Sequence, residues 1–136
     1  MTRDQAIEFL KGYRTALYEI NALERAIAET RSGVILPSHP KDGMPKGHDL
    51  QDLSAYAARI DKLERQLAKK KKEAVNKRER IIHVILALDK AEERAAMFDH
   101  YINGIQWADV AAAMHYSERQ MYYFREHAIS CIRKKL

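Results

Sequence analysis

Residues 107–136 read WADVAAAMHYSERQMYYFREHAISCIRKKL, and this stretch carries the strongest fold signal in the chain. Its first part predicts an Ala-rich helix that ends at a tight turn formed by His115 and Tyr116. A final helix begins at Ser117, with Gln120 three residues later. This spacing is typical of a capping box, in which the two side chains bond each other's backbone N–H groups.

The two helices, over residues 107–114 and from Ser117 onward, are predicted to cross steeply at the turn, as in a helix-turn-helix. Their closest approach needs a small side chain, and Ala111 lies at that point. The outer side of the second helix is then free to enter a DNA major groove, which is about as wide as a helix. The apolar residues expected at the crossing and along the second helix are Val110, Met114, Tyr116, Met121, Phe124, Ala128 and Ile132.

Upstream of this stretch, a shorter helix is expected from a cap at Asp89 to Tyr101. The dipeptide Asn103-Gly104 is a turn signal and ends that helix. Residues 81–88 are dense in apolar side chains and predict a deeply buried helix. The sequence leaves open whether this segment continues the helix before it.

Two long helices are predicted in the N-terminal half. The first covers residues 3–31. Thr2 caps its start, and Gly33, just beyond its last residue, is the glycine that ends it. Residues 33–48 hold all three prolines and predict an irregular connection, after which the second helix starts at Asp49 or Asp52. Apolar residues recur every three or four positions: Leu10, Tyr13, Leu17, Ile20 and Ile27 on the first helix, and Leu53, Tyr56, Ile60, Leu63, Leu67 and Ala74 on the second.

The connection is long enough for the helices to fold back on each other. An all-α fold is therefore predicted, with a long antiparallel helical hairpin over residues 1–75 and a DNA-binding helix-turn-helix domain over residues 76–136. The stripes are narrow, so we expect the hairpin to form a homodimer; the alternative is a monomer whose hairpin packs on the C-terminal helices. The lysines at 69–72 indicate either a solvated segment or a supporting phosphate contact.

The chain of 136 residues has a formal net charge of +5 and a sequence pI of about 9.3. This balance is compatible with a polyanionic partner. The single cysteine, Cys131, permits no disulfide within the chain and suits a reducing compartment. No stretch is long and apolar enough to span a membrane and no export signal is visible, so a cytoplasmic protein without membrane contact is expected.

The residues do not favour an enzyme. The six histidines form no HExxH motif and no pair at metal-ligand spacing, and no Gly-rich phosphate-binding motif occurs. The carboxylates lie on amphipathic helices as solvated groups, and Cys131 is interpreted as a small packed residue. We therefore expect no metal, no cofactor and no small-molecule substrate.

The C-terminal stretch resembles region 4 of bacterial sigma-70 factors and the sigma-region-4-like C-termini of small phage proteins. The resemblance depends on YINGIQWADVAAAM, residues 101–114, and on SERQMYYFREHAISCIRKKL, residues 117–136. Trp107 before the Ala-rich helix and Tyr116-Ser117 after it are especially similar to late-operon transcription regulators of the ArpU and RinA type, from phages of Gram-positive bacteria.

Two positions depart from the sigma region 4 pattern. The turn position usually held by glycine is His115, which must tolerate that backbone conformation, and the arginine that opens the closing phrase is His127. The chain has no counterpart of region 2, which melts promoter DNA, so a complete sigma factor is not expected. The resemblance implies a sequence-specific DNA-binding transcription regulator of phage or prophage genes, with double-stranded DNA as its partner and RNA polymerase as a second candidate partner.

In this interpretation the recognition helix begins at Ser117, and its first residues reach base edges. Arg119 suits a bidentate pair with guanine, and Gln120 one with adenine. Tyr122 and Tyr123 face either DNA or protein, and the basic end of the helix either holds the DNA backbone or simply complements the helix dipole. The candidate DNA-binding residues are Ser117, Glu118, Arg119, Gln120, Tyr122, Tyr123, Arg125, Glu126, Arg133 and Lys134, together with Lys135.

Two other functions stay open. A phage DNA-packaging factor, such as a small terminase subunit, also joins a helix-turn-helix to helical oligomerisation segments. A helical protein-interaction module is the third possibility, in which the helix-turn-helix binds no DNA. A ring of about eight or more subunits would favour packaging, and the absence of salt-sensitive DNA binding would favour the interaction module.

Overall fold

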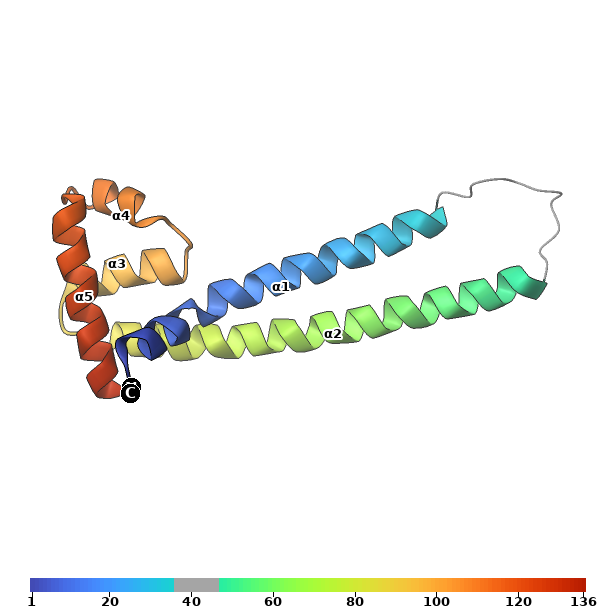
Figure 1. Ribbon diagram of the computed structural model, residues 1–136, viewed down its shortest axis with the longest axis horizontal. Coiled ribbons are helices and arrows are strands. Elements are labelled where there is room, and N and C mark those ends of the chain that lie inside the picture. Colours follow the sequence, from blue (N-terminus) through green and yellow to red (C-terminus); the bar gives the residue numbers. More distant parts are fainter. Residues whose placement is uncertain (36–46) are drawn as a thin grey trace. The chain divides into compact units, whose positions relative to one another are not determined.

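The computed structural model describes the backbone of residues 1–35 and 47–136, and the side chains outside residues 34–51. Within these ranges every regular element is a helix, so the prediction of an all-α fold is confirmed (Figure 1). The described helices are α1 (Arg3–Ile35), α2 (Gly47–Leu86), α3 (Ala91–Tyr101), α4 (Trp107–Ala113) and α5 (Glu118–Lys135).

The end of α1 differs from its prediction. The helix continues through Gly33 to Ile35, because Gly33 does not take the left-handed backbone with which a glycine ends a helix. The connection predicted for residues 33–48 is therefore helical at both described edges. Its central residues, 36–46, lie outside the described part of the chain.

The second long helix starts earlier than predicted and also runs further. α2 begins at Gly47 rather than at Asp49 or Asp52, and it continues through the apolar segment to Leu86 without a break. Residues 49–86 contain neither glycine nor proline, so nothing in this stretch interrupts the backbone hydrogen bonds. The question that the sequence left open is thereby answered in favour of one continuous helix.

The described chain divides into two compact units, and unit 2 is Tyr18–Lys72. Within it α1 and α2 run in opposite directions. The ion pairs between them show this, since residues later in α1 pair with residues earlier in α2. Glu19 Oε2 lies 2.9 Å from Lys70 Nζ, and Arg31 pairs with Glu64 further along. These exposed ion pairs stabilise little individually, but together they indicate one register for the two helices.

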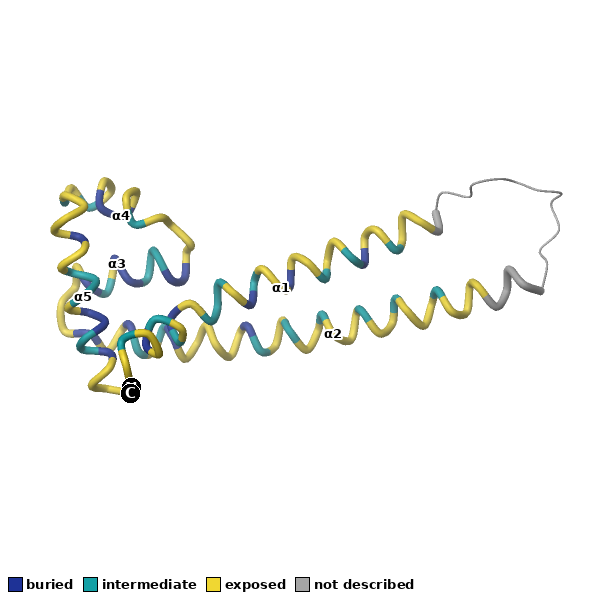
Figure 2. The backbone as a smooth tube through the Cα atoms, viewed as in Figure 1, coloured by how far each residue is buried: buried dark blue, intermediate teal, exposed yellow. Residues whose placement is uncertain are grey.

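The apolar stripes of unit 2 face inward. Ile20 and Ile27 on α1 are buried, and dark blue segments recur along that helix in Figure 2. The predicted stripe of α2 is half-buried at Tyr56, Ile60, Leu63 and Leu67. Leu53, which the spacing places on the same stripe, is instead 52% exposed.

Unit 1 comprises residues 1–17 and 73–136, so it includes the first part of α1. The predicted division after residue 75 separates this segment from the C-terminal helices, whereas in the structure the two share one core. The core draws on four helices and the residue after α3: Ala6, Leu10, Ile81, Ile85, Met97, Tyr101, Ile102, Ala128, Ile129 and Ile132, with Leu88 beside them. The start of α1 therefore belongs structurally with α3 and α5.

The connection from α2 to α3 is held by an arginine rather than by the predicted aspartate cap. The N-cap of α3 is Lys90, without a side-chain cap, and Asp89 lies outside the helix. The guanidinium of Arg94 donates to the carbonyl oxygens of Leu88 at 2.7 Å and Asp89 at 3.0 Å. These bonds satisfy carbonyl groups at the α2–α3 bend, which Asp89 cannot do as an acceptor.

α3 and α5 are joined by a buried carboxylate. Glu93 is 2% exposed, and His127 Nδ1 lies 2.5 Å from its Oε1. The carboxylate can only accept, so the imidazole donates from Nδ1. His127, where the sigma pattern has an arginine, thus supplies the hydrogen-bond donor that a buried Glu93 requires.

Candidate nucleic-acid interface

The turn between α4 and α5 has the backbone that the sequence demanded of it. His115 has a φ of 61°, in the left-handed region that favours glycine. The N–H of Tyr116 donates to the carbonyl oxygen of Ala111 at 2.9 Å, and that of His115 donates to Ala112 at 3.2 Å. The predicted tight turn at His115 and Tyr116 is confirmed.

The start of α5 is fixed by the predicted capping box. Ser117 Oγ accepts from the backbone N–H of Gln120 at 3.1 Å, and Gln120 Oε1 accepts from the backbone N–H of Ser117 at 3.2 Å. Both orphan donors at the helix end are therefore satisfied. Because the Gln120 carboxamide oxygen is used in this cap, a bidentate bond to adenine would have to break one side of the box.

The packing between α4 and α5 is as predicted. Ala111 is 1% exposed, and it lies in a cluster with Val110, Met121 and Ala96 of α3. The rings of Tyr116 and Phe124 meet edge to face, with centroids 4.9 Å apart. The remaining contributors to this cluster are Trp107 and Met114. Ala111 and Val110 of α4 and Met121 of α5 are therefore buried in one cluster, so one face of α5 is packed.

The opposite face of α5 is exposed. Glu118 and Arg119 lie on its first turn, and Tyr122 and Tyr123 follow on the next at 50% and 57% exposure. Arg119 Nε lies 3.5 Å from the Tyr123 hydroxyl, and its guanidinium carbon is 5.9 Å from the centre of that ring. We define Glu118, Arg119, Tyr122 and Tyr123 as the outer face of α5. It combines a cation, a carboxylate and two amphipathic rings.

Arg125, one of the candidate DNA-binding residues, is half-buried and packs against rings of the chain itself. Its guanidinium carbon lies 5.3 Å from the ring centre of Trp107 and 5.5 Å from that of Tyr122. Cation–π attraction of this kind links α4 to the outer face. These residues, with Glu118 and others, line a pocket of about 240 Å³. Arg125 is therefore engaged with Trp107 and Tyr122 within the chain.

Glu126 was predicted to face the groove, but its carboxylate is occupied. Arg3 donates to it from Nε at 2.9 Å and from a terminal nitrogen at 2.5 Å. The hydrogen bond from Arg3 holds the pKa of Glu126 below its usual value, with a smaller contribution from Arg125. The same bond raises the pKa of Arg3. Glu126 therefore joins α5 to the start of α1, a link that no local sequence signal reveals.

The basic residues at the end of α5 are exposed, and two of them also bond carbonyl oxygens of the chain. Arg133 Nε donates to the carbonyl oxygen of Met1 at 3.2 Å, and Lys135 Nζ donates to that of Ala87. Lys134 is exposed. All three also lie in the last turn of the helix, where the dipole favours cations. Two of the three cations that were predicted to hold a DNA backbone therefore bond carbonyl oxygens of the chain itself.

Sequence reasoning missed His100, which fixes the connection from α3 to α4. Its ring stacks on Trp107 with centroids 4.1 Å apart, and its Nδ1 lies 2.8 Å from the carbonyl oxygen of Ile105. Burial lowers the pKa of His100, and Arg125 and Lys11 act in the same direction. The carbonyl oxygen can only accept, so the imidazole donates to Ile105 from Nδ1 while its face packs on Trp107.

Within the described residues, no group of three or more histidine, cysteine or acidic side chains is arranged to hold a metal ion. In the same ranges no helix combines the length and the apolar character that crossing a membrane requires. Comparisons of the chain with protein-family models, curated proteins and solved structures found no match. A function for the chain therefore rests on the α4–α5 surface and on the sequence resemblance of residues 101–136 to sigma region 4.

Proposed function

We propose that this chain is a sequence-specific DNA-binding transcription regulator of phage or prophage genes. In this proposal α4, the turn at His115 and α5 form a sigma region 4-like helix-turn-helix, carried on an antiparallel hairpin of α1 and α2. The outer face of α5 enters the major groove. RNA polymerase is a second proposed partner, by the resemblance to sigma region 4, and the function needs no catalytic residue.

The observation that carries the proposal is the division of α5 into a packed face and an exposed face. Met121, Ala128 and Ile132 are buried, while the outer face offers polar and aromatic groups to solvent. A recognition helix needs this arrangement, because its packed face sets its position and its free face reads base edges. The capping box at Ser117 supports it further, since it fixes the end of the helix that reaches the bases first.

The chemistry of the outer face suits base reading. Arg119 can donate two hydrogen bonds to guanine, a contact worth about 1–3 kcal/mol of discrimination. Tyr122 and Tyr123 can pack against a thymine methyl group or donate a hydroxyl to a phosphate. Their 50% and 57% exposure means that packing within the subunit does not consume them. Glu118 can accept from cytosine, which adds a second kind of readout.

Binding to duplex DNA at increasing salt tests the proposal. The wild-type chain is expected to bind a labelled duplex with an affinity that falls steeply as salt rises, because cations are released from phosphates. Arg119→Glu should weaken binding about tenfold or more, since a carboxylate then faces the phosphates.

The matched control is Arg65→Glu, the same charge reversal at an exposed arginine of unit 2. Its affinity should stay within about threefold of the wild type, a change expected from long-range charge alone. Equal losses in both variants, or no salt-sensitive binding at all, would remove the proposal and leave a protein-interaction module as the better description.

A further inference from the structure

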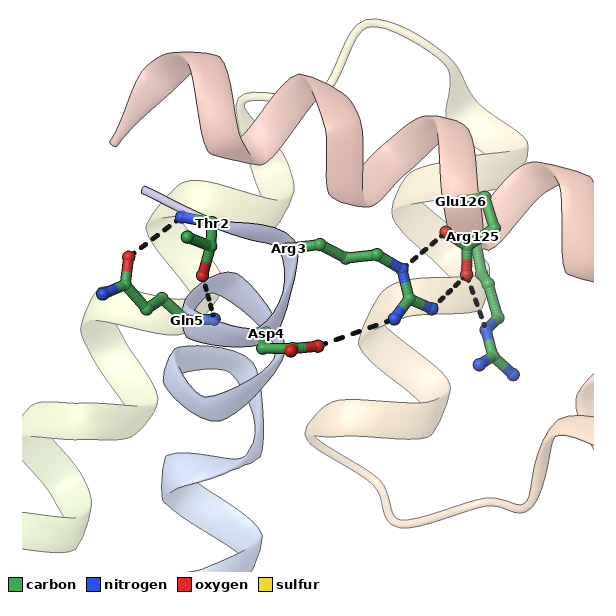
Figure 3. Close-up of polar contacts among 6 residues, drawn as sticks. All are labelled: Thr2, Arg3, Asp4, Gln5, Arg125 and Glu126. Atoms are coloured by element: carbon green, nitrogen blue, oxygen red, sulfur yellow. Dashed lines mark hydrogen bonds and ion pairs between the residues drawn. The ribbon is translucent and has the colours of Figure 1, made fainter.

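The start of α1 is fixed by a capping box of its own. Thr2 Oγ1 accepts from the backbone N–H of Gln5 at 3.1 Å, and Gln5 Oε1 accepts from the backbone N–H of Thr2 at 2.9 Å (Figure 3). This reciprocal pair orders the first turn of the helix. Arg3, the first helical residue, therefore projects from a defined position rather than from a frayed end.

From that position Arg3 clamps the carboxylate of Glu126 on α5. Figure 3 shows the guanidinium of Arg3 directed at both carboxylate oxygens, with bonds of 2.9 Å and 2.5 Å. Asp4 lies 3.9 Å from the same guanidinium, and Arg125 Nε lies 3.8 Å from Glu126. Fork-to-fork pairs of arginine and carboxylate are the strongest and most directional of such contacts.

The place of Glu126 on α5 makes this pair relevant to the outer face. Glu126 follows Tyr123 by three residues and Tyr122 by four, so it continues the same side of the helix. A free carboxylate there would repel the phosphates of a duplex lying along α5. Arg3 cancels that charge, and its fork leaves Glu126 directed at α1.

We propose that Arg3 is a positioning residue for DNA binding: it neutralises Glu126 and holds that carboxylate away from the duplex, so that the outer face of α5 is open to DNA. This inference rests on the proposed function of α5. It adds that the start of α1, far from α5 in the sequence, is part of the DNA-reading apparatus. The proposed binding surface therefore needs the start of α1 as well as α5.

The test compares Arg3→Ala, Glu126→Gln and the double variant in binding to labelled duplex DNA. Arg3→Ala should weaken binding about fivefold or more, because it frees a carboxylate beside the groove. Glu126→Gln should stay within about twofold of the wild type. The double variant should recover most of the affinity that Arg3→Ala loses, although it still lacks the clamp. This recovery separates charge neutralisation from a merely structural role, in which the double variant stays as weak as Arg3→Ala.

Arg25→Ala is the matched control, because it removes one exposed positive charge from the same helix within unit 2. It should change binding by less than about twofold, and a loss equal to that of Arg3→Ala would overturn the inference. Circular dichroism tests whether each variant is folded. If Arg3→Ala fails to fold, Arg3→Gln, which keeps a polar side chain, replaces it with the same expected order of affinities.

A readout without DNA separates this inference from the proposed function. Carbon NMR of the Glu126 carboxyl group should show it titrating at a lower pH in the wild type than in Arg3→Ala, in line with the direction of its pKa. An unchanged titration would overturn the inference while the function of α5 stands. A clear difference in titration together with no DNA binding by the wild type would overturn the proposed function, and this inference with it.

Discussion

His115 adopts a backbone conformation that costs a side-chain-bearing residue free energy. Its φ of 61° lies in the left-handed region, as does the 74° of Gly104 in the turn before α4. These two positions are the described turns on either side of α4. A histidine is tolerated at position 115 because its side chain is exposed. The cost to a residue other than glycine is about 1–2 kcal/mol.

The two turns make opposite predictions for the free energy of unfolding. His115→Gly should raise it by about 0.5–1 kcal/mol, the relief of backbone strain less the extra entropy of glycine in the unfolded chain. Gly104→Ala should lower it by about 1–2 kcal/mol, because alanine strains the same kind of backbone. An added Cβ at Gly104 would also lie 2.5 Å from the guanidinium of Arg14, which must then move.

Urea unfolding followed by circular dichroism measures both changes on the same scale. The midpoint should move to higher urea for His115→Gly and to lower urea for Gly104→Ala, with similar slopes. A midpoint for His115→Gly at or below that of the wild type would contradict the account of the turn.

At the scale of elements, the helices that local signals mark were predicted well. Ser117 with Gln120 marked the start of α5, and Ala111 was correctly predicted to be packed between α4 and α5, because cap and packing residues lie within a few positions of each other. The predicted end of α1 was wrong because a glycine ends a helix only when it adopts the left-handed backbone itself, and Gly33 stays helical. The cap at Asp89 was wrong because Arg94 satisfies the bend between α2 and α3 instead.

Of the candidate site, only the exposed side chains on the outer face of α5 could be predicted from the sequence. Arg119, Tyr122 and Tyr123 lie where the helical period places them. The tie between Glu126 and Arg3 joins residues 123 positions apart, and that between His127 and Glu93 spans 34. A single sequence holds no periodic or spacing signal for such pairs. The side chains that the sequence could not place are therefore those whose partners lie on distant elements.

The pair formed by α1 and α2 in unit 2 bears on the homodimer that the sequence predicts. Its described exposed large apolar residues are Tyr18, 69% exposed, and Leu53, so most of the stripe is used within the chain. Light scattering at micromolar concentration should give twice the chain mass of 15.8 kDa if the dimer forms, and Tyr18→Glu should reduce it. A wild-type mass of one chain would remove the dimer, and one of about eight or more chains would favour a packaging factor.

At the scale of the whole molecule, unit 1 is built from both ends of the chain. Ala6 and Leu10 of α1 share a core with α3 and α5, so the DNA-reading helix proposed here is not an independent C-terminal module. Removing the first residues should therefore disturb α5 as much as changes close to it. This organisation explains why a surface charge on α5 can be governed by a residue at the start of α1.

The central claim is that the outer face of α5 reads base sequence. Selection of duplexes from a random pool, followed by sequencing, tests it most directly. The wild type should enrich one short motif, and Arg119→Ala should lose the preference for guanine at one position of that motif while keeping the rest. An identical motif for both proteins, or no enrichment by the wild type, would contradict the claim.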